Sequence, residues 1–233
     1  MSREHFHQRL DELRTRLLHM SRDVEDLVDR SVGLATGRGG ATTADIVADD
    51  RAIDELEVSI EETAIELLAL HQPMAGDLRV LVTILKINND LERIGDHAVN
   101  IAEAAERLGR AKRPPPLPPE LEEMSDLARG MLRDGLDALV HHSAEEARRV
   151  MERDDRVDRL HESLFRVMLT HMTEHNISAC LQVILIGRNL ERIADLATNI
   201  GEDVVYMVRG ITVRHGVGAD SATGDAEPGS PDP

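Results

Sequence analysis

Two segments of the chain carry polar side chains whose type and spacing suit metal binding. In each, Glu, Asp, Asn and Glu follow one another at spacings of four, four and three residues, which places all four on one face of a helix. The residues are Glu92, Asp96, Asn100 and Glu103, and then Glu191, Asp195, Asn199 and Glu202. Oxygen ligands of this kind suit hard or borderline ions such as Mg²⁺, Mn²⁺, Ca²⁺ or iron.

The segment before each of these carries a second set of acidic residues at helical spacing. The first is Asp50, Asp54, Glu57 and Glu61; its counterpart is Asp154, Asp158 and His161, with Phe165 where Glu61 would fall. Like charges four residues apart destabilise a helix by about 0.2–0.5 kcal/mol per pair, and a bound cation would offset this. Sets on adjacent helices would suit a multinuclear cluster. The plainer interpretation is a solvated acidic face, preserved by duplication without a function; one sequence leaves both open.

An internal repeat explains why the pattern occurs twice. Residues 91–103 read LERIGDHAVNIAE, and residues 190–202 read LERIADLATNIGE, 99 positions later. A repeat covering about half the chain predicts two similar units with the same polar arrangement. The arginine in each phrase, Arg93 or Arg192, is expected to form an ion pair within its own helix.

Composition and periodicity predict an all-α fold. Aromatic residues make up 1% of the chain, whereas sheet cores rely on aromatic and β-branched residues. Apolar residues at alternating spacings of three and four predict helices over about 10–34, 42–70, 76–108, 120–141, a fifth beginning at Ser143, and a sixth over 176–209. The acidic faces lie nearly opposite the apolar seam of Leu91, Ile94 and Ala98, so we expect them to face away from the core.

The expected architecture is two tandem up-down three-helix bundles. We expect the first bundle over 1–112, a stiff proline-rich linker over 113–119, the second bundle over 120–213 and a disordered tail over 214–233. Thr42 and Asp45, Ser143 and Glu146, and Asn176 are the expected helix caps.

The net charge of the chain limits the classes of partner that it can bind. The 44 acidic and 27 basic residues give a net charge of −17, which disfavours nucleic acid and anionic lipid and favours a cation or a basic protein. The single cysteine, Cys180, excludes an internal disulfide and is expected in the core. The N-terminus lacks a signal-like apolar stretch, and no apolar run would span a bilayer. We therefore expect a soluble, cytoplasmic protein without membrane insertion.

Several functions remain compatible with these residues. No nucleophile–base pair or phosphate-cradling glycine loop is evident, so a non-catalytic adaptor is favoured. A di-iron or di-manganese carboxylate enzyme is the alternative from another class, although such sites use inward-facing Glu-x-x-His motifs and this chain offers only Asp158-x-x-His161. A metal-free acidic scaffold that binds a basic partner is the third.

The two repeated phrases, preceded by LLALHQPMAGDLR, resemble the PhoU family of phosphate-signalling proteins over residues of about 5–211. The resemblance implies two three-helix bundles, homodimers, and clusters of iron, manganese, magnesium or zinc held by the pairs Asp50 and Asp54, Glu92 and Asp96, Asp154 and Asp158, and Glu191 and Asp195. Asn100, Glu103, Asn199 and Glu202 would extend these sites.

The resemblance also implies a role in phosphate homeostasis. Members hold the phosphate-starvation response off when phosphate is plentiful, by contacting a sensor histidine kinase and the ATPase of a phosphate ABC transporter. Family members often carry histidine after the aspartate of both repeats. Here His97 fits this pattern, whereas the second repeat has Leu196. If that histidine helps to hold a metal or a partner, the second site is expected to be weaker or to select a different ion.

Overall fold

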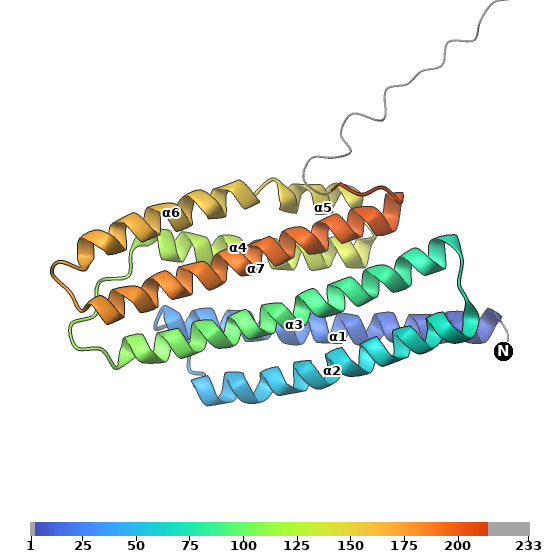
Figure 1. The fold of residues 1–233 in the computed structure, drawn as a ribbon, viewed down its shortest axis with the longest axis horizontal. Coiled ribbons are helices and arrows are strands. Elements are labelled where there is room, and N and C mark those ends of the chain that lie inside the picture. The colour runs from blue at the N-terminus through green and yellow to red at the C-terminus, as the bar shows by residue number, and fades with distance from the viewer. Residues whose placement is uncertain (1–2, 214–233) are drawn as a thin grey trace, which may run out of the picture.

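The computed structural model describes residues 3–213 of the 233-residue chain, and this part is helical throughout except for short connections (Figure 1). The helices are α1 (Arg3–Ala35), α2 (Thr43–His71), α3 (Ala75–Gly109), α4 (Pro119–His141), α5 (Ala144–Met151), α6 (Asp154–His171) and α7 (Ile177–Arg209). Helices α1–α3 form one up-down bundle, and α4–α7 form a second of the same plan. This confirms the predicted fold class. The expected tail over 214–233 lies outside the described residues.

Local signals set the ends of the helices as the sequence predicts. At α2, Thr42 accepts a hydrogen bond from the backbone of Asp45, and the Asp45 side chain accepts one from the backbone of Thr42. The side chain of Asn176 caps α7 in the same way by accepting from Ala179. Helix α7 ends at Gly210, whose φ of 70° is the left-handed conformation that glycine adopts without strain.

The predicted fifth helix is wrong in one respect, because the chain breaks it into α5 and α6 at residues 152–153. Hydrogen bonds from Arg153 to Val150 and from Arg156 to Arg153 tighten the backbone there to a spacing of three residues. The break makes Asp154 the first residue of α6. A carboxylate is favoured there by the partial positive charge of a helix N-terminus.

The apolar seams read from the sequence form the core of each bundle. Leu13, Met20 and Leu27 of α1 are buried against the seam of α3, and Cys180 is buried at the start of α7. Small side chains such as Ala98 and Ala197 are fully buried and allow the helices to approach closely. No helix among the described residues is both long and apolar enough to cross a membrane.

The two bundles are joined along their full length and not only through the linker. Helices α3 and α7 lie side by side and run in opposite directions (Figure 1). Two contacts fix their register: Lys86 Nζ lies 2.7 Å from Asp203 Oδ1, and His97 Nδ1 lies 2.9 Å from Asn189 Oδ1. The helices that carry the repeated acidic sequences are therefore also the helices that hold the halves together.

Candidate metal centre

Adjacent helices of the first bundle bring five carboxylates together. Asp50, Asp54 and Glu57 come from α2, and Glu92 and Asp96 come from α3; we call these five residues the first cluster. Their proximity is evident in their electrostatics. Burial, followed by the charges of Asp54 and Asp96, raises the pKa of Asp50 to about 6. Burial and then Asp96 raise the pKa of Glu92, and burial and then Glu61 raise that of Glu57.

The Asp50 carboxylate lies against Gly95 of the facing helix α3. A Cβ on Gly95 would lie 2.6 Å from Asp50 Oδ1, so the carboxylate approaches the backbone of α3 where the side chain is missing. This oxygen is buried and has no hydrogen-bond partner. A buried, unsatisfied carboxylate oxygen is unfavourable without a compensating group.

Nothing among the described residues neutralises the first cluster. None of its five carboxylates forms an ion pair or accepts a side-chain hydrogen bond from residues 3–213. Arg93, although adjacent to Glu92, points toward Asp90, with its Nη1 3.7 Å from Asp90 Oδ1. The expected ion pair within the helix is present, but it does not reach the cluster.

The second bundle places the equivalent residues together with internal partners. Asp154, Asp158 and His161 of α6 and Glu191 and Asp195 of α7 make up the second cluster. His161 Nδ1 lies 3.1 Å from Glu191 Oε2. Burial raises the pKa of Asp154 and of Asp158, and a hydrogen bond to Asp154 acts in the opposite direction.

Two further contacts give carboxylates of the second cluster a polar partner. Arg192 Nη1 lies 2.9 Å from Asp195 Oδ2, and Thr198 Oγ1 donates to Asp154 Oδ1 over 3.1 Å. Three of the four carboxylates therefore have a polar partner from within the chain.

The four residues predicted to extend the sites do not belong to either cluster in the structure. They are Asn100, Glu103, Asn199 and Glu202. Glu103 pairs with Arg107 at 2.7 Å, and Glu202 lines a pocket of about 260 Å³ together with Lys86 and Asp203. Asn100 is exposed and Asn199 is half-buried. Of the residues proposed from the sequence, the structure brings together the eight Asp and Glu residues of the four short motifs. Glu57 and His161 complete the two groups.

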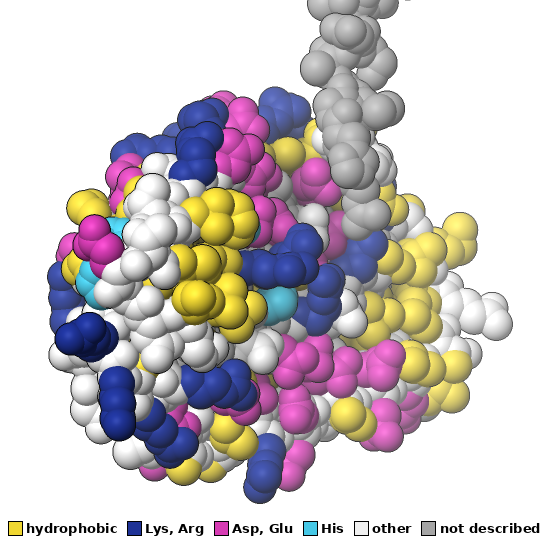
Figure 2. Space-filling view, turned by 60° about the vertical axis from the view of Figure 1, so that its left-hand side comes forward, with side chains coloured by type: hydrophobic (Ala, Val, Ile, Leu, Met, Phe, Trp, Pro, Cys, Tyr) yellow, Lys and Arg dark blue, Asp and Glu magenta, His cyan; other side chains and the backbone are white. Residues whose placement is uncertain are grey.

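The acidic faces point less directly outward than the helical spacing suggests. Asp96 is exposed as expected, but Glu92 is half-buried, and so are Glu191 and Asp195. The reason is that α2 and α6 pack beside these faces. Figure 2 shows acidic side chains gathered in the lower part of the molecule, where α2 and α3 lie, with basic side chains and a histidine above them.

His97 does not serve the first cluster. Its Nδ1 faces Asn189 on α7, and burial lowers its pKa. The histidine that distinguishes the two repeats is thus a contact between the halves. This contact could not be predicted from the sequence, since Asn189 lies 92 residues away in the chain.

The donor chemistry of the first cluster fits a hard cation. All five groups offer oxygen, and Asp50 supplies a buried oxygen without a partner. In the structure as it stands, no group of three or more His, Cys, Asp or Glu side chains in residues 3–213 is arranged to hold a metal ion.

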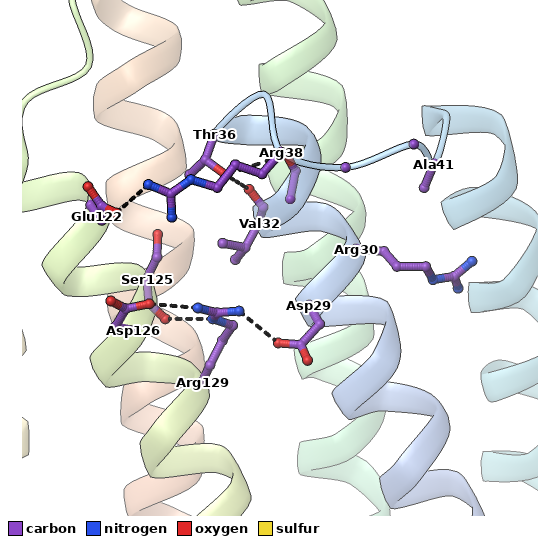
Figure 3. Close-up of a pocket in the computed structure, with 13 residues that line it drawn as sticks. Asp29, Arg30, Val32, Thr36, Arg38, Ala41, Glu122, Ser125, Asp126 and Arg129 are labelled. Carbon is purple, nitrogen blue, oxygen red and sulfur yellow. Dashed lines mark hydrogen bonds and ion pairs between the residues drawn. The ribbon is translucent and has the colours of Figure 1, made fainter.

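A separate pocket lies where α1 and the loop after it meet α4 (Figure 3). It measures about 410 Å³. Its arginines are engaged with carboxylates: Arg38 with Glu122, and Arg129 with Asp126 and, at 3.2 Å, with Asp29. The pocket is a polar junction between the halves and has no part in either cluster.

Comparison with known proteins covers nearly the whole described chain. The family model "PhoU domain" matches twice, at residues 17–105 and 121–204. A phosphate-specific transport system accessory protein PhoU homolog from Pseudomonas putida is 38% identical over 91% of this chain and 84% of its own length. The homolog from Clostridium acetobutylicum is 35% identical over 90% of this chain and 97% of its own length.

Solved structures agree with these sequence matches. The crystal structure of PhoU from Pseudomonas aeruginosa aligns with a TM-score of 0.83 and 34% identity, covering 88% of this chain and all of that one. The phosphate transport system regulatory protein PhoU from Streptococcus pneumoniae aligns with a TM-score of 0.79 and 30% identity, covering 89% of this chain and 99% of that one.

Proposed function

The chain belongs to the PhoU family, and on this premise we propose that it is a non-catalytic accessory protein of phosphate-specific transport. In this role it holds the phosphate-starvation response off while phosphate is plentiful. The observation that carries the proposal is the match of the family model to both halves. The matches cover most of the length of these relatives, which are named as accessory proteins and not as enzymes. That naming speaks against the di-metal enzyme.

The proposed partners are a sensor histidine kinase and the ATPase of a phosphate ABC transporter. A net charge of −17 supports docking to basic surfaces of such partners, because complementary charge speeds encounter and selects the partner. In this proposal the protein works in the cytoplasm as a homodimer and reaches the membrane through its partners.

Metal binding at the carboxylate clusters is part of the proposal. Asp50, Asp54, Glu92 and Asp96 would hold a cation in the first half, and Asp154, Asp158, Glu191 and Asp195 are the equivalent donors in the second. A bound iron, manganese, magnesium or zinc ion would supply the positive charge that offsets the repulsion between these carboxylates. The chain's own contribution is to hold two helices in register, so that carboxylates from both face one another.

A phosphatase reporter of the starvation response tests the regulatory role. A strain without the gene, grown in high phosphate, should show derepressed phosphatase, and the wild-type gene should silence it again. Unchanged output in the deletion strain would refute the regulatory role for this protein.

A variant tests whether the carboxylates serve that role. The substitutions Glu92→Gln, Asp96→Asn, Glu191→Gln and Asp195→Asn keep size and remove charge, and folding is checked by circular dichroism. We expect this variant to fail to restore repression. Full restoration by the folded variant would favour the metal-free scaffold.

A further inference from the structure

We propose that the outer side of α6 and α7, next to the loop that joins them, is a docking site for an amphipathic helix of a partner protein. The helix would place apolar side chains on this surface and a carboxylate against Arg188. The site is additional to the proposed function, which names partners but no surface for them, and it does not depend on the carboxylate clusters. We call this surface the α6–α7 face; its apolar residues are Phe165, Leu169, Ile177, Leu181 and Leu185.

The five apolar side chains of the α6–α7 face are exposed to solvent. On α6, Phe165 is 46% exposed and Leu169 is 47% exposed. On α7, the exposed fractions are 58% for Ile177, 46% for Leu181 and 41% for Leu185. Within each helix these residues are four positions apart, so they form a row along one side. Soluble proteins seldom expose adjoining rows of this kind unless another molecule covers them.

The two rows lie on the same side of the helix pair. Phe165 comes four residues after His161, which meets Glu191 of α7 at 3.1 Å. Leu185 comes seven residues before Arg192, which pairs with Asp195 in the second cluster at 2.9 Å. Both rows therefore run from the second cluster toward the α6–α7 loop. Figure 2 shows hydrophobic side chains gathered at this end of the molecule, with basic side chains beside them.

The internal repeat shows that the first half lacks this apolar face. Lys86, at the position equivalent to Leu185, pairs with the buried Asp203 across the interface between the halves. Three exposed or half-exposed positions differ in this way: two charged residues are replaced by large apolar ones, and an amide is replaced by a cation. The pairs are Glu61 and Phe165, Lys86 and Leu185, and Asn89 and Arg188.

The shape of the α6–α7 pair suits a helix. The same pair is covered by α4 on its inner side, where Gly135 lies against Ala197 of α7. Side chains of a further helix can enter the groove between two packed helices in the same manner on the outer side. The row from Ile177 to Leu185 is about 12 Å long, which is the length of two helical turns with apolar residues at i, i+4 and i+7.

Arg188 gives the site its charge preference. It is exposed, three residues after Leu185, and it forms no ion pair within residues 3–213. The arginines near it differ, since Arg107 pairs with Glu103 and Arg192 with Asp195. A carboxylate on the docked helix would therefore find a free guanidinium. The net charge of −17 disfavours a second copy of the chain or an anionic membrane as the occupant.

Selection of phage-displayed helical peptides on the purified full-length protein tests the site. We expect enriched peptides to carry apolar residues at i, i+4 and i+7 together with Asp or Glu. Leu181→Ser/Leu185→Ser should weaken their binding by about tenfold or more. The matched control is Val58→Ser/Ile65→Ser, which removes two equally exposed apolar side chains from α2 and should bind as the wild type does. No enrichment, or equal loss in both variants, would overturn the inference.

A charge exchange tests the role of Arg188 in a folded protein. Arg188→Glu should weaken binding of an enriched peptide several-fold, and replacing the acidic residue of the peptide with lysine should restore it. A structural defect would not be rescued by a change in the peptide. Binding that is unaffected by Arg188→Glu, or loss without rescue, would contradict the assigned charge preference.

The other occupants give different results. A wild-type dimer that Leu181→Ser/Leu185→Ser dissociates, measured by light scattering, would assign the face to a second copy. Binding to phosphatidylglycerol vesicles that the same variant abolishes would assign it to a membrane. Either result would overturn the inference. Peptide binding is measured on the purified protein, so its failure leaves the regulatory role to the reporter assay, and an unchanged reporter leaves the docking site in place.

Discussion

Lys86 and Asp203 form an ion pair between α3 and α7, with Lys86 Nζ 2.7 Å from Asp203 Oδ1. The two partners differ in exposure: the side chain of Asp203 is 4% exposed and that of Lys86 is 38% exposed. Lys86 also lies over the ring of Tyr206, 5.4 Å from its centroid. The Asp203 carboxylate stays buried whether or not the Lys86 ammonium is present. Removing Lys86 would therefore leave a buried negative charge without a counter-charge.

We therefore predict that Lys86→Met destabilises the protein. The substitution leaves Asp203 buried without its counter-charge, and the free energy of unfolding should fall by about 2–3 kcal/mol, with the exposure of Lys86 moderating the loss. Urea denaturation followed by circular dichroism measures this. Adding Asp203→Leu to Lys86→Met should recover much of the loss, because the unpaired charge is then gone.

An exposed ion pair between the halves provides the matched control. Arg133 on α4 pairs with Glu25 on α1 at 2.7 Å, and its side chain is 58% exposed. Arg133→Met should change stability by less than about 1 kcal/mol. Similar losses for Lys86→Met and Arg133→Met would mean that burial of Asp203 is not the source of the effect.

The second prediction concerns pH and the first cluster. The pKa of Asp50 in the folded protein is about 6, above its usual 3.8, so the native state holds this proton more tightly than the unfolded chain does. The Asp50 contribution to stability therefore falls as pH rises from about 4 to about 7. Asp50→Asn removes the charge, and at pH 7.5 with chelator it should stabilise the protein by about 1 kcal/mol once solvent screening is allowed for.

The measurement is the difference in unfolding free energy between wild type and variant at pH 4.5 and pH 7.5. The gain from Asp50→Asn should be larger at pH 7.5. Glu62→Gln, which removes an exposed carboxylate from the same helix, serves as control and should show no such trend. A gain that is the same at both pH values would show that repulsion on Asp50 is not what the variant relieves.

The third prediction uses the close approach of Asp50 to Gly95. Gly95→Ala places a Cβ 2.6 Å from Asp50 Oδ1, so the carboxylate must move. Alanine favours the helix by about 1 kcal/mol over glycine, which offsets part of that displacement. We expect a change of less than about 1 kcal/mol in stability but clearly weaker Mn²⁺ binding.

Gly130→Ala in α4 separates the two effects. A Cβ there would meet Arg153 Nη1 at an ordinary 3.6 Å. This variant should gain stability and leave Mn²⁺ binding unchanged. If Gly95→Ala left Mn²⁺ binding unchanged as well, the position of Asp50 would be irrelevant to the ion.

The helices were predictable because local signals specify them. The seam of Leu91, Ile94 and Ala98 and the caps at Thr42 and Asn176 depend on residues only a few positions apart. The break at residues 152–153 was missed. It contains neither glycine nor proline, and its tightened hydrogen bonds leave no mark in the sequence.

The membership of the clusters was largely predictable, but their inequality was not. Helical spacing places Glu92 beside Asp96, and the repeat supplies the counterparts. The partners that distinguish the halves, such as Thr198 for Asp154, come from a different helix and depend on packing. A residue-by-residue alignment of the two repeats would have shown the signal at Asp90 and Asn189, and at Glu57 and His161.

The packing of α3 against α7 fixes the distance between the two clusters. With 35 and 33 residues, the helices are about 50 Å long at 1.5 Å per residue, and Lys86 and His97 prevent one from sliding along the other. Because Lys86 meets Asp203 and His97 meets Asn189, residues 92–96 of α3 lie level with residues 191–195 of α7, so both clusters lie at the same height along this helix pair. A partner that contacts both clusters must match their spacing, and such a rigid surface loses little conformational freedom when it is bound.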